Sequence, residues 1–472
     1  MNIVDCLVIG SGPGGAVTAL ELKKANKDVI LLEAGSHYSL DSCQPYSTSE
    51  MEQKYKFGGL TPTFGKPKIS YAEGSCVGGG SEVNSGFYHR TPDKILSLWA
   101  KKYKILNFTK KELKPYFEAI EKEISVSLVP DKSMIAKASI KLKEGADKLG
   151  WDNMEVPRWF KFNDKNKGTK QSMTETHVKW YIENGGVLKD NSLVIKIKSK
   201  SNYWVVYYKD LKNNQKKKIK AKSVFLCGGA VSTPFLLRKS GIKRNIGNTL
   251  QMHPTIKVIA EFDEIINYTN MGVPVHQVKE FSPNISFGCS ISSKPFLALA
   301  MLDNEKYIDK VEKNWEKMGI YYGAIIPSGY GKIRKLPYFN DPLVTYSLND
   351  DDLILLSEAL KKMCLMLFKA GAKNIYPSIK DYGVINKEKE LEFLPKILDR
   401  SKTGLMTIHL FSSCPMGEDE KICAVDSHGK IFGHKNLYVN DGSLLPSAPG
   451  VNPQGTIMAI ARRNIHHFLG LT

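Results

Sequence analysis

The sequence lacks any apolar run of about 18 residues, the length that a membrane-spanning helix requires. It also lacks a Cys-x-x-Cys pair, although eight cysteines are dispersed along its 472 residues. This spacing favours neither a disulfide framework nor a zinc site, so we expect free thiols, a reducing compartment and no metal. Because the first apolar segment begins a few residues after Met1, we expect no cleavable leader and a cytoplasmic protein.

Acidic residues are few relative to basic ones. The chain has 48 Asp and Glu against 67 Lys and Arg, a formal net charge of +19. The lysines are scattered, and there is neither an arginine run nor a stripe of alternating basic and aromatic residues, so we expect no nucleic-acid partner. The densest lysine run, 216–222, is typical of one arm of a surface hairpin. We favour a solvated surface, with steering of an anionic ligand as the alternative; nothing indicates peripheral contact with a membrane.

A strand, a glycine turn, a helix and a second strand open the sequence. Residues 6–9 are an apolar run, residues 10–15 read Gly-Ser-Gly-Pro-Gly-Gly, and an apolar helical pattern follows. The second strand, 28–32, ends in Glu33. In this order the parts predict a dinucleotide-binding fold, in preference to a glycine turn that only packs a helix on a strand.

Each part of this motif has a physical task. Gly10 allows the tight turn, Gly12 lets a pyrophosphate approach the main chain, and Gly15 lets the helix pack closely on the sheet. The N-terminus of the helix offers free N–H groups to the phosphates. Glu33 can accept hydrogen bonds from a ribose hydroxyl and would repel the 2′-phosphate of NADP, so this motif predicts NAD or FAD without separating them.

Three later segments point to the flavin. Residues 78–84 read Gly-Gly-Gly-Ser-Glu-Val-Asn, and consecutive glycines permit close approach of a flat or anionic group. Residues 224–230 run from an apolar strand into glycines, and residues 436–457 contain Asp-Gly-Ser and then Asn-Pro before an apolar helix. With the N-terminal motif, these segments resemble the glucose-methanol-choline (GMC) family of FAD-dependent oxidoreductases over nearly the whole chain.

The resemblance implies a set of FAD-binding residues. The turn 10–15 and Glu33 would hold the ADP half, the loop 78–84 would line the flavin and pyrophosphate, Val194 would meet the adenine, and Asp441 would bind the ribityl or phosphate region. The predicted set is Gly10, Ser11, Gly12, Pro13, Gly14, Gly15, Glu33, Ala34, Gly79, Gly80, Ser81, Asn84, Val194, Cys227, Gly228, Gly229, Asp441, Gly442, Asn452 and Pro453. Some relatives attach FAD covalently through a histidine directly before the loop asparagine. Val83 stands at that position, so we expect noncovalent FAD.

The resemblance also identifies a reacting pair, His409 and Asn452. Oxidising an alcohol removes a proton from oxygen and a hydride from carbon, and an imidazole can take the proton. Asn452 can hydrogen-bond to the substrate oxygen without adding charge. It also fits the N-cap of a helix that has Pro453 at its first position. We expect His253, in a His-Pro pair, to be structural, and leave open whether His89 faces the flavin.

The predicted fold class is α/β: a Rossmann-type FAD-binding domain with a discontinuous α+β substrate domain built on an antiparallel sheet. The length of 472 residues suits two domains. We assign residues 1–100, 185–255 and 405–472 to the first domain, and residues 101–184 and 256–404 to the second.

The function expected is that of an FAD-dependent oxidase or dehydrogenase acting on a small-molecule alcohol, with oxygen, a quinone or a carrier protein as electron acceptor. Three alternatives stay open: lyase or decarboxylase chemistry on the same scaffold, a nicotinamide dehydrogenase, and a noncatalytic FAD-bound protein at a membrane surface. The apolar run 296–302 indicates core. An apolar channel for a lipid-like alcohol is the alternative, because short runs within 331–346 look similar to long-chain alcohol oxidases and cholesterol oxidase-like members.

Overall fold

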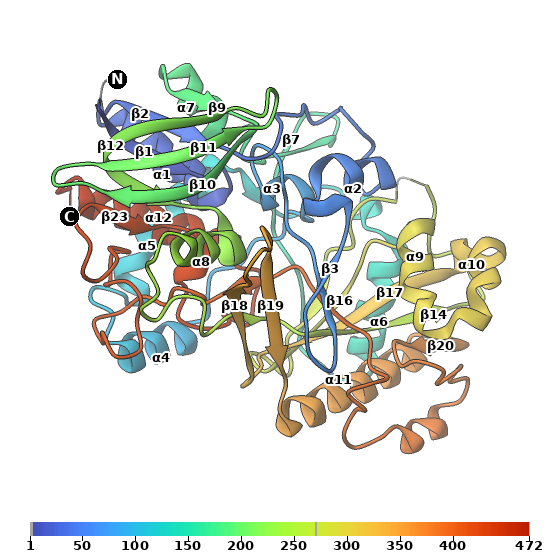
Figure 1. The fold of residues 1–472 in the computed structure, drawn as a ribbon. Coiled ribbons are helices and arrows are strands. Elements are labelled where there is room, and N and C mark those ends of the chain that lie inside the picture. The colour runs from blue at the N-terminus through green and yellow to red at the C-terminus, as the bar shows by residue number, and fades with distance from the viewer. Residues whose placement is uncertain (1–2, 270, 472) are drawn as a thin grey trace.

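Two sheets organise the molecule (Figure 1). The computed structural model describes residues 3–269 and 271–471. Figure 1 shows one sheet, with the N-terminal strands, at the upper left and the other at the lower right. The predicted α/β class, with a Rossmann-type part and an antiparallel sheet, is confirmed.

The first sheet is mainly parallel around the N-terminal strand. Its strands in spatial order are β10 (Ser192–Ser199), β11 (Trp204–Asp210), β12 (Lys216–Leu226), β1 (Ile3–Ile9), β2 (Val29–Leu32) and β9 (Val187–Lys189), and β23 (Leu437–Val439) pairs with β12. Ile9 pairs with Leu226 in β12 and with Leu32 in β2. Strands β1, β12 and β2 therefore end at one edge, from which Gly10, Cys227 and Glu33 continue.

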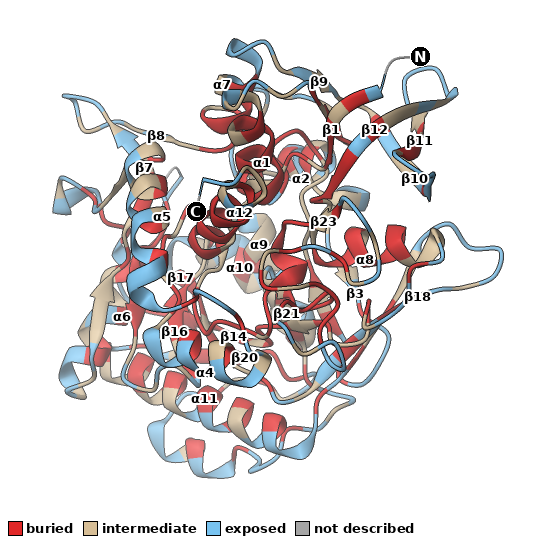
Figure 2. Cartoon of the chain, turned by 90° about the vertical axis from the view of Figure 1, so that its left-hand side faces the viewer, coloured by how far each residue is buried: buried red, intermediate tan, exposed pale blue. Residues whose placement is uncertain are grey.

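Helices pack against this sheet, and two of them are largely buried. The helices of this part are α1 (Pro13–Lys24), α4 (Asp93–Tyr103), α5 (Lys110–Glu123), α7 (His177–Glu183), α8 (Gly229–Lys239) and α12 (Gln454–Phe468). Helices α1 and α12 are largely buried near the centre of the molecule (Figure 2). The close packing of α1 follows from its small residues Gly14, Gly15, Ala16 and Ala19, all buried.

The second sheet is mainly antiparallel. Its strands in spatial order are β3 (Thr61–Pro62), β4 (Ile69–Tyr71), β21 (Leu405–Thr407), β14 (Thr255–Glu261), β17 (Met318–Ile325), β16 (Ile285–Cys289), β15 (His276–Val278) and β6 (Asn153–Glu155), and β20 (Asn374–Pro377) pairs with β14. One face packs Ile256, Phe287 and other apolar side chains against α6 (Lys137–Lys148) and α11 (Asp350–Lys369). The other face is polar near β15 and β17, and we call it the polar face.

The remaining elements are short. They are the strands β5 (Val126–Ser127), β7 (Arg158–Phe162), β8 (Gly168–Lys170), β13 (Gln251–Met252), β18 (Tyr330–Lys335), β19 (Pro342–Ser347) and β22 (Leu410–Phe411), and the helices α2 (Thr48–Lys54), α3 (Gly80–Val83), α9 (Lys294–Met301) and α10 (Ile308–Asn314). Among the described residues, no helix combines the length and the apolar character needed to cross a bilayer. All eight cysteines are free thiols, seven of them buried.

Two sequence expectations are modified by packing. Of the apolar run 296–302, only Leu297 and Met301 are buried, while Leu299 and Leu302 are exposed, so the run is core on one side only. Helices α5 and α7, from the range 101–184, join the apolar core of the first sheet, and β21 joins the second sheet. The division into two domains remains a proposal, and these contacts would move α5 and α7 to the nucleotide-binding part.

Candidate active site

The glycine turn, residues 10–15, packs tightly on its inner side. Gly10 has φ +100°, and a methyl group there would overlap the carbonyl of Cys227. A methyl group at Gly15 would overlap the carbonyl of Gly10, so α1 can lie this close to β1 only with glycine. The main-chain N–H of Cys227 donates to the carbonyl of Ile9 at 2.7 Å and ties the turn to the end of β12.

The outer side of the turn is open. A methyl group at Gly12 would meet no heavy atom within 4 Å beyond its chain neighbours in the described structure, and the same holds at Gly80. Gly79 lies against Gly12, since a methyl group at Gly79 would come within 3.0 Å of its Cα. Gly12 precedes α1, whose first turn has free N–H groups and no side-chain cap. These open glycine surfaces at a helix N-terminus fit a pyrophosphate.

Glu33 connects the turn to the following loops. Its Oε2 accepts hydrogen bonds from the N–H (2.9 Å) and Oγ (2.7 Å) of Ser11, and its Oε1 accepts one from the N–H of Gly35 (2.9 Å). Burial raises the pKa of Glu33, against the opposing effect of these hydrogen bonds. The N–H of Gly78 donates to Ser11 Oγ at 3.0 Å, so the glycine turn and the glycine loop, residues 78–84, are joined.

Asp441 joins the two C-terminal glycine segments. Its Oδ2 accepts from the N–H of Gly229 (2.8 Å) and from Thr233 Oγ1 (2.6 Å), while Oδ1 accepts from the N–H and Oγ of Ser443. The carboxylate is buried, which raises its pKa. With four donors on its two oxygens, this side chain organises the ends of β12 and β23, and a contact with a ligand would come from its main chain.

Other predicted cofactor residues border the same region. Val194 lies at an irregularity in β10, two residues after Ser192, whose N–H donates to the carbonyl of Glu33 at 2.7 Å. Ser81 is buried in α3, and Asn84 Nδ2 donates to Gln454 Oε1 at 2.8 Å, which joins the glycine loop to the start of α12. Ala34, Gly228 and Gly442 continue the ends of β2, β12 and β23 at this edge.

His409 and Asn452, 43 residues apart in the chain, meet in space. His409 lies between β21 and β22, and its Nε2 is 3.2 Å from Nδ2 of Asn452. The pair adjoins the cofactor residues, because the N–H of Ser412 donates to the carbonyl of Gly442 at 3.4 Å. Burial lowers the pKa of His409 to about 4, so the imidazole is neutral near pH 7.

Asn452 does not cap the last helix, contrary to one sequence interpretation. The residue at the cap of α12 is Pro453, with φ −86° and ψ −14°, and no side chain accepts a hydrogen bond from the first turn. The amide of Asn452 turns instead to His409 and to Gln277, whose Nε2 donates to Asn452 Oδ1 at 3.4 Å. Tertiary partners outcompete the local cap at this position.

His253 contacts His409 directly, although we expected it to be structural. Its Nδ1 is 3.0 Å from Nδ1 of His409, and the two rings meet edge to face. Its Nε2 accepts the N–H of Gly450 at 3.1 Å. The sequence signal, a His-Pro pair, does not distinguish a structural histidine from one that touches the reacting imidazole.

These contacts determine where His409 carries its proton. A main-chain N–H can only donate, so His253 Nε2 has no proton and the neutral ring carries it on Nδ1. His253 Nδ1–H then donates to His409 Nδ1, which leaves the proton of neutral His409 on Nε2. That N–H faces Asn452, whose amide accepts it only after turning by half a rotation, which gives up the hydrogen bond from Gln277.

Neutral polar side chains surround the pair on the side of the second sheet. Gln277 Nε2 donates to the hydroxyl of Tyr322 at 3.2 Å, and Gln277 Oε1 is 3.1 Å from Nε2 of His89. Burial lowers the pKa of His89 to about 3 and raises that of Tyr322 to about 12, so both are uncharged near pH 7. Tyr322 lies across Gly288, where any side chain would overlap its hydroxyl. Whether His89 would touch a flavin remains a prediction.

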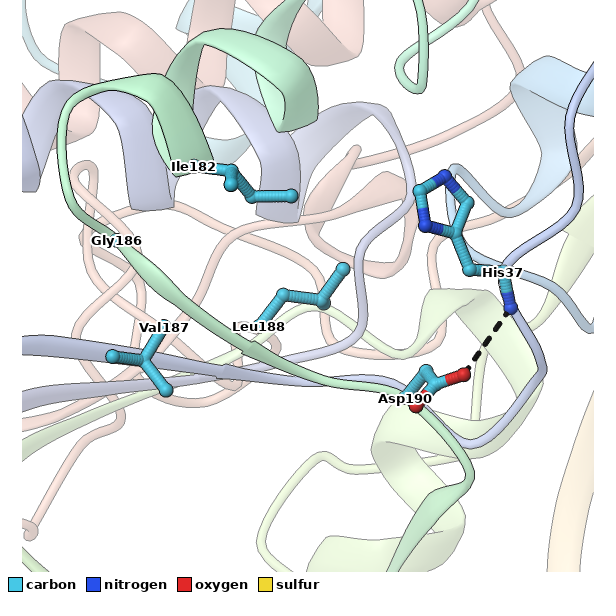
Figure 3. A pocket seen from close by; sticks show the side chains of 6 residues that line it. All are labelled: His37, Ile182, Gly186, Val187, Leu188 and Asp190. Atoms are coloured by element: carbon cyan, nitrogen blue, oxygen red, sulfur yellow. Dashed lines mark hydrogen bonds between the residues drawn. The ribbon is translucent and has the colours of Figure 1, made fainter.

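A separate pocket of about 460 Å³ lies at the outer edge of the first sheet (Figure 3). It is lined by His37, Ile182, Gly186, Val187, Leu188 and Asp190. The N–H of His37 donates to Asp190 Oδ2 at 3.4 Å across its rim. None of the predicted site residues lines it.

Comparisons with known proteins cover nearly the entire chain. Residues 51–255 and 335–461 match family models described as GMC oxidoreductase, and residues 8–50 match a model described as an NAD(P)-binding Rossmann-like domain. The chain is 39% identical to an uncharacterized GMC-type oxidoreductase of Sinorhizobium fredii, over 97% of this chain and 93% of that protein.

More distant relatives extend the comparison. The chain is 26% identical to a long-chain-alcohol oxidase of Arabidopsis thaliana, over 97% of this chain but only 66% of that protein. Among solved structures, pyridoxine 4-oxidase from Mesorbium loti has a similar fold, with a TM-score of 0.75, 15% sequence identity and 99% of both chains covered.

Proposed function

This chain belongs to the GMC oxidoreductase family and is therefore a flavoprotein oxidoreductase, and on this premise we propose that it binds FAD noncovalently and oxidises an alcohol to a carbonyl compound. The observation that carries the proposal is the contact between His409 Nε2 and Asn452 Nδ2, and the hydrogen bond from Asn84 to Gln454, two residues after Asn452, links it to the glycine loop. Relatives named as a long-chain-alcohol oxidase and a pyridoxine 4-oxidase support oxidation of a CH–OH group.

The cofactor would be held by main-chain groups. The first turn of α1 and the open surfaces of Gly12 and Gly80 would receive the pyrophosphate. Glu33 would accept a hydrogen bond from a ribose hydroxyl, either in addition to the hydrogen bond from Ser11 or in its place. Val83 at the position used elsewhere for covalent attachment supports noncovalent binding. When bound, FAD supplies the acceptor for the hydride.

The protein's own groups would handle the proton. We place the alcohol oxygen between His409 Nε2 and Asn452, which can both hydrogen-bond to it. To accept the hydroxyl proton at Nε2, His409 must first carry its own proton on Nδ1. This N–H then donates a hydrogen bond to His253 Nδ1. His253 then carries its proton on Nε2 and gives up the hydrogen bond from Gly450, at about 1 kcal/mol. His253 is thus a positioning residue that selects which ring nitrogen of His409 carries the proton.

The decisive experiment is anaerobic reduction of the bound flavin. We expect the purified protein to be yellow, and an alcohol from a panel of sugars, sterols, choline and fatty or aromatic alcohols to bleach it without oxygen. Bound FAD that no alcohol bleaches would favour lyase or decarboxylase chemistry, or a noncatalytic role. A preparation that stays colourless with added FAD would contradict the cofactor proposal.

We expect the rate of flavin reduction by a neutral alcohol to be constant from about pH 6 to about pH 7, because burial lowers the pKa of His409 from 6.5 to about 4. As the pH falls through about 4, the imidazole gains a proton, can no longer accept one, and the rate falls. The neighbouring rings of His253 and His89 are neutral in this range, because burial, with Lys279 acting in the same direction, lowers the pKa of each. Stopped-flow reduction across pH tests this; a midpoint near 6.5 would contradict it.

A further inference from the structure

Two lysines lie on the polar face that also carries Gln277 and Tyr322. Lys257, in β14, is directly opposite Tyr322 in β17. Lys279 follows Gln277 by two residues and therefore points to the same side, where its Nζ donates to Ser286 Oγ at 3.1 Å. Since Gln277 contacts both Tyr322 and Asn452, the two lysines share a sheet face with side chains that lead to the reacting pair.

Neither lysine has an acidic partner. Burial lowers the pKa of each ammonium to about 8, and no carboxylate opposes this effect. Within residues 3–269 and 271–471, neither amine forms an ion pair, and Nζ of Lys257 makes no hydrogen bond. Glu280, the acid next to Lys279, is exposed and accepts the N–H of Asp152 instead.

Two other partly buried lysines, Lys141 and Lys56, are neutralised, whereas Lys54 and Lys170 form no ion pair among the described residues. Nζ of Lys141 is 2.9 Å from Glu144 and 2.6 Å from Glu264. Nζ of Lys56 is 3.2 Å from Glu73. The side chains of Lys257 and Lys279 are half-buried, and even partial removal of an ammonium from water is unfavourable unless an anion compensates it, so two lysines without an ion pair on this sheet face point to an anionic group on the ligand.

We propose that the substrate is an alcohol with a carboxylate or phosphate group that pairs with Lys257 and Lys279 while its carbinol lies at His409 and Asn452, an inference that rests on the proposed function. The surrounding Gln277, Tyr322 and His89 are neutral and offer hydrogen bonds to the rest of a polar molecule. A plain fatty alcohol would leave both ammonium groups without an anionic partner. The net charge of +19 would steer such an anion to the protein.

The test uses the FAD-loaded full-length enzyme and three aromatic alcohols that differ in charge: benzyl alcohol, 4-(hydroxymethyl)benzoate and 4-(hydroxymethyl)phenyl phosphate. Dissociation constants come from perturbation of the flavin absorbance, and reduction rates from anaerobic stopped flow. We expect at least one acidic alcohol to bind about tenfold or more tightly than benzyl alcohol, since hydrogen bonds to charged groups are among the stronger ones. Comparing the dissociation constants of the carboxylate and the phosphate shows which acidic group the site binds more tightly.

Lys257→Met and Lys279→Met keep the aliphatic part of each side chain and remove the charge. We expect each to weaken binding of the preferred acidic alcohol about tenfold and to leave benzyl alcohol unaffected. Lys198→Met, at an exposed position of β10, is the matched control, and it should change the affinity for neither the acidic alcohol nor benzyl alcohol. Because an uncompensated charge is removed, the melting temperature of the two variants should not fall, which separates this effect from unfolding.

Two results would overturn the inference: equal affinity for benzyl alcohol and both acidic alcohols, or unchanged affinity for the acids in both lysine variants. Failure of the proposed function looks different. In that case no alcohol, neutral or acidic, would reduce the flavin, whatever the affinity of the site for anions.

Discussion

Replacing His409 with alanine lowers the rate of flavin reduction by an alcohol about 10²- to 10⁴-fold, the range for loss of a positioned acid–base group. The side chain lies 3.2 Å from Asn452 and 3.0 Å from His253, and its pKa of about 4 keeps it neutral and able to exchange a proton. The measurement is single-turnover reduction of the bound flavin without oxygen, followed by its visible absorbance.

The matched control for this variant is His37→Ala. The His37 side chain is exposed, and its only polar contact in the described structure uses the main-chain N–H, so its removal should leave the rate unchanged. Both variants should retain the wild-type flavin content and melting temperature. A His409→Ala enzyme that reduces its flavin at the wild-type rate would remove this residue from the reacting centre.

Gly12→Ala should abolish retention of FAD during purification while the protein remains folded. A methyl group at this position meets no heavy atom within 4 Å beyond its chain neighbours in the described structure, and φ of −62° suits an L-residue. The methyl would occupy the space through which the pyrophosphate approaches the first turn of α1. We expect affinity for FAD to fall about 100-fold, equivalent to about 2.7 kcal/mol. Titration of the apoprotein with FAD measures it.

Gly14→Ala, two residues further along, should destabilise the fold of the apoprotein. A methyl group there would overlap the carbonyl of Asn440, so the substitution pushes α1 away from the end of β23. Overpacking of this kind costs about 1–3 kcal/mol, and the melting temperature of the apoprotein should fall. Gly12→Ala should not lower it. If Gly12→Ala binds FAD normally, the open surface at Gly12 is not the phosphate site.

Much of the fold follows from local patterns in the sequence. Helix α11, Asp350–Lys369, forms where Asn349 and Asp352 make a capping box and apolar residues recur at steps of three and four. The lysine run 216–222 lies in β12 and pairs with β11 as a hairpin arm. The family prediction, which depended on several ordered motifs, is confirmed.

The surroundings of the reacting pair were not predictable in the same way. Gln277, Tyr322, Lys257 and Lys279 carry no motif, and each lies on a different strand or strand end of one sheet face. Their proximity to His409 depends on the register of β14, β17, β16 and β15. Register depends on long-range pairing, which a single sequence does not reveal. The same holds for His253, whose role is visible only when Gly450 and His409 are on either side of it.

The sequence alone determined the nucleotide turn, the free thiols and the order of the glycine segments, because these depend on local backbone chemistry and on residue type, while the two candidate reacting side chains came from the resemblance to the GMC family. The tertiary structure decided that Asn452 turns to His409 rather than capping α12, that His253 contacts His409, and that two lysines without ion pairs share a sheet face with Gln277 and Tyr322. The physical reason is that hydrogen bonding and burial depend on distances between segments far apart in the chain, and only folding establishes those distances.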